Sequence, residues 1–171
     1  MRLEFPEGKH EKAYFEMIKE FANANEKIIP EATNLKKGET YDDFLQRIKN
    51  SKEGKNLKPG YVAGTLYFLI NNKERIVWTI DIRHELNEQL RVEGGNIAYG
   101  IRPSERKKWY ATIWLKLGLK KCKELWMDKV LITCDKKNIW SSKVIIKNGG
   151  ILDAEYRLRD SIEQRYWIQI Q

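Results

Sequence analysis

The sequence has few of the residues on which small metal-binding and disulfide-bonded proteins depend. Its 171 residues include two cysteines, Cys122 and Cys134, and two histidines. The cysteines have neither zinc-site nor redox-pair spacing, so we expect ordinary buried thiols. Walker-type loops, Ser/His/Asp arrangements and clusters with metal-ligand spacing are also missing. We therefore expect no metal.

Long hydrophobic runs are missing as well. No segment approaches the roughly 20 apolar residues that a membrane-spanning helix requires, and the N-terminus lacks an apolar signal-peptide core. We therefore expect a cytoplasmic protein without membrane contact. Repeats and low-complexity segments are absent, and a hydrophobic content of 42% is typical of a globular chain. The length predicts a single domain over residues 1–171.

Basic residues outnumber acidic ones, giving a formal net charge of +8. Such a charge indicates an anionic partner, either nucleic acid or a multiply phosphorylated cofactor. Tryptophan and tyrosine side chains would permit base stacking. The lysines, however, alternate with acidic residues along the expected helices, which is the pattern of solvated faces. This pattern makes nucleic-acid binding the less favoured interpretation, although the charge alone suits either partner.

Residues 96–112 organise the rest of the chain. Ile97, Tyr99 and Ile101 alternate with smaller residues, which predicts a strand, and Pro103 ends it. Because the strand leads directly into a basic turn and a helical pattern, the segment predicts a strand–turn–helix unit.

The helix of this unit is predicted from Arg106 to Leu125, with Ser104 as its cap. A helix N-terminus attracts anions through its unpaired N–H groups and its dipole. Arg106, Lys107 and Lys108 add three cations there. The unit suits a phosphate group, although a solvated basic helix start is an alternative.

The other elements follow from periodicity and turn residues. Strands are predicted at 1–5, 61–70, 75–83, 129–133, 151–159 and 165–170, and helices at 11–24, after Thr40, briefly within 83–93, and at 138–147. The short strand at 129–133 is expected to be buried and parallel. This order predicts an α+β (mixed α/β) fold whose mostly antiparallel central sheet contains one βαβ crossover and is flanked by helices.

Three motifs resemble those of the GNAT acetyltransferases, in the family's order. The family's acetyl-CoA pyrophosphate signature, Arg/Gln-x-x-Gly-x-Gly/Ala, reads here as Arg106-Lys107-Lys108-Trp109-Tyr110-Ala111. The run from Asp128 to Ser141 fits the next strand and its asparagine-containing helix cap. Asn148-Gly149-Gly150 fits the turn before the last hairpin. The resemblance covers residues 60–171, and its main departure is Trp109 at a glycine position.

This resemblance implies a GNAT-type acyl-CoA N-acyltransferase fold. It implies an enzyme that transfers an acetyl group from acetyl-CoA to a primary amine of a small molecule or peptide, directly within a ternary complex. Residues 60–171 would form the acetyl-CoA-binding core, and residues 1–59 would shape the acceptor site. The acceptor itself is not identified, and a monomer or homodimer is expected.

The resemblance also implies the cofactor contacts. The pantetheine arm would pair with the strand backbone, the pyrophosphate would bind N–H groups of the following turn, and the asparagine cap would hydrogen-bond the pantetheine region. The expected cofactor-binding residues are Tyr99, Gly100, Ile101, Arg106, Lys107, Lys108, Trp109, Tyr110, Ala111, Thr112, Asn138 and Ser141. Asn138 also suits a plain helix N-cap.

A general base is needed because an amine arrives protonated, with a reference pKa near 10.4 for a lysine-like group. His84, at the end of a predicted strand, is the preferred candidate since imidazole titrates near neutrality. The alternative is that His84 only hydrogen-bonds a nearby carbonyl. Glu85 and Asp81 are further candidates for the base.

A proton donor for the departing thiolate is less evident. Many resembling enzymes use a tyrosine on the last helix, but Ile145 occupies the aligned position. Tyr99 and Tyr156 are the substitutes, although either could be an ordinary sheet tyrosine. The absence of that tyrosine, with Trp109, also leaves open a catalytically silent binding module.

Four tryptophans, Trp78, Trp109, Trp126 and Trp140, occupy positions where resembling sequences carry glycine or another small residue. Trp126 follows the long helix at a left-handed cap position, where a bulky residue should cost about 1 kcal/mol. We hypothesise that these four codons are read as glycine in the source organism.

Overall fold

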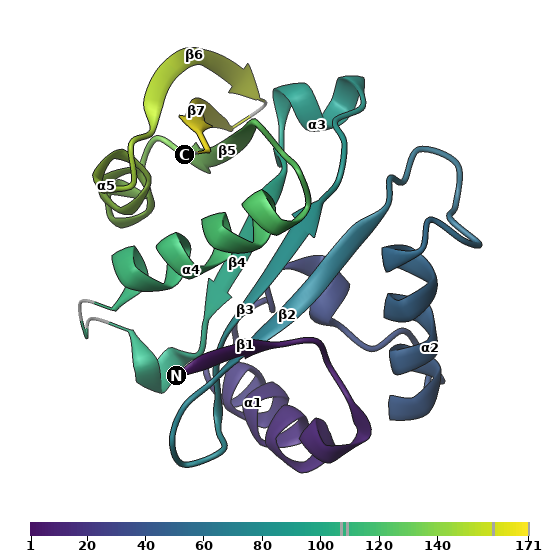
Figure 1. Cartoon of the computed structure of the whole chain (residues 1–171). Helices are drawn as coiled ribbons and strands as arrows, with labels where there is room; N and C mark the ends of the chain where they lie inside the picture. Colours follow the sequence, from purple (N-terminus) through teal and green to yellow (C-terminus); the bar gives the residue numbers. More distant parts are fainter. Residues whose placement is uncertain (107, 109, 159, 171) are drawn as a thin grey trace. The chain divides into compact units, whose positions relative to one another are not determined.

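The computed structural model describes residues 1–106, 108, 110–158 and 160–170. Its elements are β1 (Arg2–Glu4), η1 (Gly8–His10), α1 (Glu11–Asn23), η2 (Glu31–Thr33), α2 (Tyr41–Lys52), β2 (Gly64–Ile70), β3 (Ile76–Arg83), α3 (Glu88–Val92), β4 (Ile97–Ile101), η3 (Pro103–Glu105), α4 (Ala111–Glu124), β5 (Lys129–Asp135), α5 (Ile139–Lys147), β6 (Ile151–Leu158) and β7 (Ser161–Gln169) (Figure 1). They divide into two compact units, residues 1–81 with 99–108, and residues 82–98 with 109–171.

The strands form two sheets. One has the order β1-β2-β3-β4, and the other has the order β5-β7-β6. β1 pairs antiparallel with β2, and β7 pairs antiparallel with both β5 and β6. The predicted mixed fold with mostly antiparallel strands is confirmed. The prediction of a parallel strand at 129–133 within one central sheet is wrong, because β5 belongs to the second sheet.

Asn96 explains part of this difference. Its backbone N–H donates to the carbonyl of Leu131 in β5 at 2.7 Å, and its side-chain oxygen accepts the N–H of Leu131 at 2.9 Å. A side chain thus takes a main-chain donor that a neighbouring strand would otherwise use. Gly95, with φ +61°, makes this approach possible, since a Cβ there would lie 2.4 Å from the Leu131 carbonyl oxygen.

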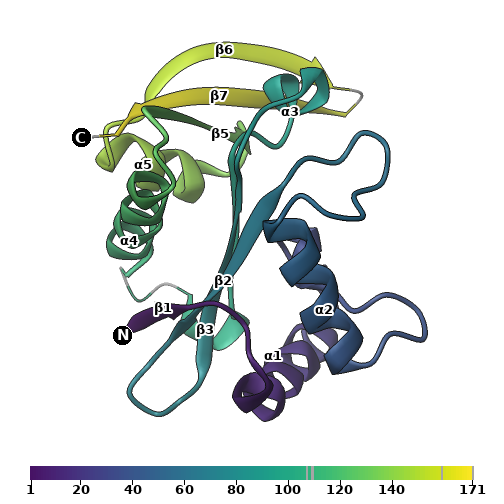
Figure 2. The same cartoon turned by 45° about the vertical axis from the view of Figure 1, so that its right-hand side comes forward.

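The first unit has a core built from two helices and two strands (Figure 2). α1 buries Tyr14, Met17 and Phe21, which recur at the three- and four-residue spacing of one helix face. Thr40 caps α2 as predicted: its hydroxyl accepts the Asp43 N–H at 3.1 Å, and the Asp43 carboxylate accepts the Thr40 N–H at 3.0 Å. The predicted helices at 11–24 and after Thr40 are therefore confirmed.

In the second unit, α4 packs against α5 and buries Trp114, Leu115, Gly118 and Cys122. The predicted helix at 138–147 and the closing hairpin are confirmed as α5 and the β6–β7 pair. In the described part of the chain, no helix is long and apolar enough to cross a bilayer.

Candidate functional site

The turn between β4 and α4 differs from its prediction. The long helix begins at Ala111, not at Arg106, and a separate 3-10 turn, η3, precedes it. Ser104 lies inside η3 and does not cap α4. Its backbone N–H donates to Glu20 Oε1 at 2.6 Å, so a contact from α1 fixes this residue. Lys107 and Trp109 lie outside the described residues.

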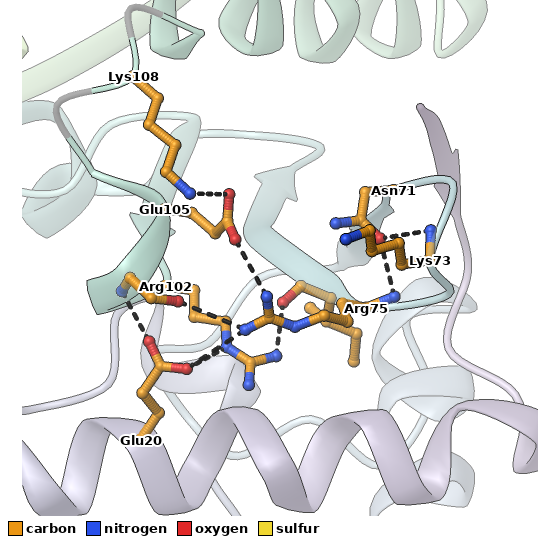
Figure 3. Close-up of polar contacts among 9 residues, drawn as sticks. Glu20, Asn71, Lys73, Arg75, Arg102, Glu105 and Lys108 are labelled. Atoms are coloured by element: carbon orange, nitrogen blue, oxygen red, sulfur yellow. Dashed lines mark hydrogen bonds and ion pairs between the residues drawn. The ribbon is translucent and has the colours of Figure 1, made fainter.

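A polar network anchors η3 to the rest of the first unit (Figure 3). Arg102, only 4% exposed, donates from Nε to Glu20 Oε2 at 2.5 Å and from a terminal nitrogen to the Ile76 carbonyl at 3.2 Å. Glu105 accepts from Arg75 at 3.4 Å and from Lys108 at 3.0 Å. Since Lys108 already pairs with Glu105, its charge is partly neutralised before any ligand binds.

Arg106 makes three side-chain hydrogen bonds, and its side chain is 37% exposed. Its two terminal nitrogens donate to Glu26 at 2.8 and 2.6 Å, and its Nε donates to the Ile101 carbonyl at 3.1 Å. Its guanidinium also lies over the Phe21 ring, 5.8 Å from the centroid. A hydrogen bond from the Arg106 guanidinium lowers the pKa of the Glu26 carboxyl, so that carboxyl is ionised at neutral pH.

The three β4 residues assigned to pantetheine lie as predicted on the strand. The half-buried Tyr99 packs its ring against Trp78, with centroids 5.6 Å apart. Gly100 lies against the backbone of Ile29. In the described part of the chain, β4 is the terminal strand of its sheet.

Among the described residues, no side chain caps the start of α4. The side chain of Tyr110, at the cap position, accepts no backbone N–H, and α1 likewise lacks a capping side chain, whereas α2, α3 and α5 each have one. Asn148, at the end of α5, donates to the carbonyl of Thr112 at 3.1 Å and so holds the first turn of α4. An uncapped helix start has backbone donors suited to an anion.

Asn138 is confirmed as an N-cap, since its side-chain oxygen accepts the Ser141 N–H at 3.1 Å. The Ser141 hydroxyl hydrogen-bonds the Cys134 thiol, whose pKa burial raises to about 11. Burial raises the pKa of Cys122 to about 12. The expectation of buried thiols is therefore confirmed.

His84 lies in a pocket of about 290 Å³ whose other lining residues include Asn96, Trp126, Lys129 and Trp167. The pocket is at the C-terminal end of α4, so within this unit His84 and the uncapped start of α4 are at opposite ends of that helix. Neighbouring Glu85 is exposed.

Asp81 and Tyr156 are the remaining candidates for the catalytic base and the proton donor. Asp81 is 8% exposed within β3. The Tyr156 hydroxyl accepts a hydrogen bond from Arg165 at 3.1 Å, and the Arg165 guanidinium lies over the Tyr156 ring. In the described ranges, no three His, Cys, Asp or Glu side chains are grouped to hold a metal.

The sequence did not predict which residues position the site. Glu20 and Glu26 contact the β4–α4 turn, Asn148 contacts the first turn of α4, and Asn96 contacts β5. Of these residues, Asn148 belongs to the Asn148-Gly149-Gly150 motif, but that motif does not predict its contact with α4.

No family model and no curated protein sequence matches this chain. Solved structures do match it. Ribosomal-protein-S5-alanine acetyltransferase from Vibrio fischeri has a TM-score of 0.71 at 12% identity, over 98% of this chain and 92% of that one. Spermidine N-acetyltransferase from Vibrio cholerae, in complex with CoA and spermine, has a TM-score of 0.64 at 14% identity, over 99% of this chain and 95% of that one. A further structure of the Vibrio cholerae enzyme is dodecameric.

Proposed function

We propose that this chain, which has the fold of the GNAT-type N-acetyltransferases, transfers an acetyl group from acetyl-CoA to a primary amine of a small molecule or peptide. The observation that carries the proposal is the similarity to N-acetyltransferases over 98% and 99% of the chain. The transfer would be direct, in a ternary complex, within one domain in the cytoplasm. Residues 1–59 would shape the acceptor site.

The uncapped start of α4 supports a pyrophosphate site. The N–H groups of Tyr110, Ala111 and Thr112 would donate to the phosphate oxygens, and the helix dipole would add to the attraction. Lys108 would add a cation, and Lys107 and Trp109 belong to the same proposed turn.

The terminal positions of two strands support a site for the pantetheine arm. β4 ends one sheet and β5 ends the other, and the main-chain edge of such a strand can pair with an extended amide chain. We assign the arm to Tyr99, Gly100 and Ile101 on β4. Asn138 and Ser141, which follow β5, would contact the same arm.

The chemistry is a nucleophilic acyl substitution. The amine gives up one proton before attack, its nitrogen bonds to the thioester carbonyl carbon, and the carbon–sulfur bond then breaks. A second proton leaves the nitrogen as the amide forms, and the thiolate takes up one. We assign His84 as the base, with Glu85 as the alternative, and Tyr99 as the donor to the thiolate.

The proposal is tested by measuring the CoA thiol released from acetyl-CoA in the presence of a panel of amines, with product masses as confirmation. The raised pKa values of Cys122 and Cys134 should keep the native protein's own thiols from reacting. Amine-dependent release supports the proposal, and its absence together with absent acetyl-CoA binding in calorimetry overturns it.

A catalytically silent binding module is the second candidate. The observation that favours it is that Ile145, at the position aligned with a tyrosine, is fully buried and has no hydroxyl to offer. Acetyl-CoA binding without release for any amine in the panel would support this candidate.

A further inference from the structure

The Arg106 side chain is engaged by its own unit on three nitrogens. Two donate to the Glu26 carboxylate in a forked pair at 2.8 and 2.6 Å, and the third donates to the Ile101 carbonyl at 3.1 Å. A forked guanidinium–carboxylate pair is among the stronger hydrogen-bonded pairs in proteins, and it fixes orientation as well as distance. A phosphate group would have to displace Glu26 to take these donors.

The same turn has a second carboxylate anchor. Glu20, near the end of α1, accepts the Ser104 N–H at 2.6 Å and Arg102 Nε at 2.5 Å. Glu26 lies six residues later, just beyond α1. Two carboxylates from one stretch of chain therefore hold residues 102–106, the first part of the turn that leads from β4 toward α4.

We propose that Arg106 and Glu26 are positioning residues: they hold this turn in place for the cofactor's pyrophosphate, and the Arg106 side chain does not bind the phosphate itself. The inference rests on the proposed function. It separates the role of the arginine in the signature from that of the backbone N–H groups that follow it. Glu26 offsets part of the charge of Arg106, so Arg106 contributes mainly through the hydrogen bonds that hold the turn.

The test is a double-mutant cycle with CoA binding measured by calorimetry. Glu26→Gln and Arg106→Gln should each weaken binding about tenfold, and the double variant should be no weaker than either single one. The direction in which Glu26→Gln changes CoA affinity distinguishes the two roles. If Arg106 bound the phosphate directly, removal of the Glu26 carboxylate would free its guanidinium and CoA would bind more tightly. Arg106→Lys should not restore affinity, since lysine keeps the charge but loses the fork.

A matched control uses another surface pair, Lys121 and Glu124 on α4, which are 2.7 Å apart. Lys121→Gln and Glu124→Gln make the same charge changes and should leave CoA affinity unchanged. Thermal unfolding checks that each variant is folded, and in turnover the KM for acetyl-CoA should rise with little change in kcat. That split would not follow from a general loss of structure.

The outcomes separate the two proposals. If the unaltered protein does not bind CoA, the proposed function fails and this inference fails with it. If the unaltered protein binds CoA but Glu26→Gln binds equally well or more tightly, only the positioning role is overturned. Rescue by Arg106→Lys would also overturn it, because charge alone would then suffice.

Discussion

The carbonyl oxygen of Ile29 occupies the place where a side chain on Gly100 would begin: a Cβ there would lie 1.9 Å from that oxygen. The same oxygen accepts a hydrogen bond from the Thr79 hydroxyl at 3.2 Å. The segment between α1 and α2 is therefore held directly against β4, and glycine at position 100 is what permits the contact.

Gly100→Ala should lower the free energy of unfolding by about 1–3 kcal/mol, because the backbone of Ile29 must move away. It should also weaken acetyl-CoA binding if Gly100 contacts the pantetheine arm. Denaturant unfolding and calorimetry measure the two effects. Gly8→Ala is the matched control, since a Cβ at Gly8 would meet nothing within 4 Å. An equal loss in both variants would contradict the steric explanation.

His84→Gln should lower the maximal rate roughly a hundredfold while leaving acetyl-CoA affinity unchanged, if His84 is the base. The pH–rate profile of the unaltered enzyme should then bend near neutrality, where imidazole ordinarily titrates. Glu85→Gln should have a small effect. A larger loss in Glu85→Gln than in His84→Gln would transfer the role to the carboxylate.

Trp126→Gly should raise the free energy of unfolding by about 1 kcal/mol. Trp126 has φ +59°, and the N–H of Met127 reaches back to the Cys122 carbonyl at 3.1 Å, as in a Schellman motif. The side chain is 93% exposed, so little packing is lost. Trp126→Ala keeps the Cβ and should give no such gain. Equal effects of the two substitutions would exclude backbone strain as the cause.

The hypothesis of codons read as glycine meets a different situation at Trp78. Its side chain is 1% exposed, so Trp78→Gly should leave a cavity and cost about 3–5 kcal/mol. The left-handed backbone conformation of Trp126 agrees with the hypothesis, whereas the buried side chain of Trp78 does not. The codons in the gene, with the mass of the native protein, decide the matter, and ordinary tryptophan codons would refute recoding.

Stability should fall as the pH is lowered from about 4.5 to about 2, and Glu4 should account for part of that fall. Hydrogen bonds from Lys9, Arg2 and His10 lower the pKa of Glu4 from 4.5 to about 2. The unfolded chain therefore binds a proton in this window before the folded chain does, which favours unfolding. Glu4→Gln should flatten the dependence measured by thermal unfolding; an unchanged acid slope would argue against Glu4.

Local signals predicted most elements of the fold. The apolar spacing of Tyr14, Met17 and Phe21 gave α1, and the Thr40 cap gave the start of α2, because both depend on neighbours a few residues away. The start of α4 was predicted five residues too early, since Glu20 fixes Ser104 from 84 positions away. Hydrophobic periodicity reflects neighbours a few residues away, so it cannot predict such a contact.

The candidate site was only partly predictable for the same reason. The motif identified the turn at Arg106 and the cap at Asn138, and the cap is confirmed. The partner of Arg106 was not visible, because Glu26 lies 80 positions earlier in a polar connection without regular structure. The roles of His84 and Tyr99 remain predictions.

Because no side chain in the described part of the chain caps α4, the amides at the start of this helix can report whether an anion is bound there. Amide protons at a helix start without a capping acceptor exchange readily with solvent. An anion bound there would supply the acceptor, so exchange at Tyr110 to Ile113 should slow when CoA is added, whether or not any amine is acetylated. Binding and turnover can then be followed separately in the same sample.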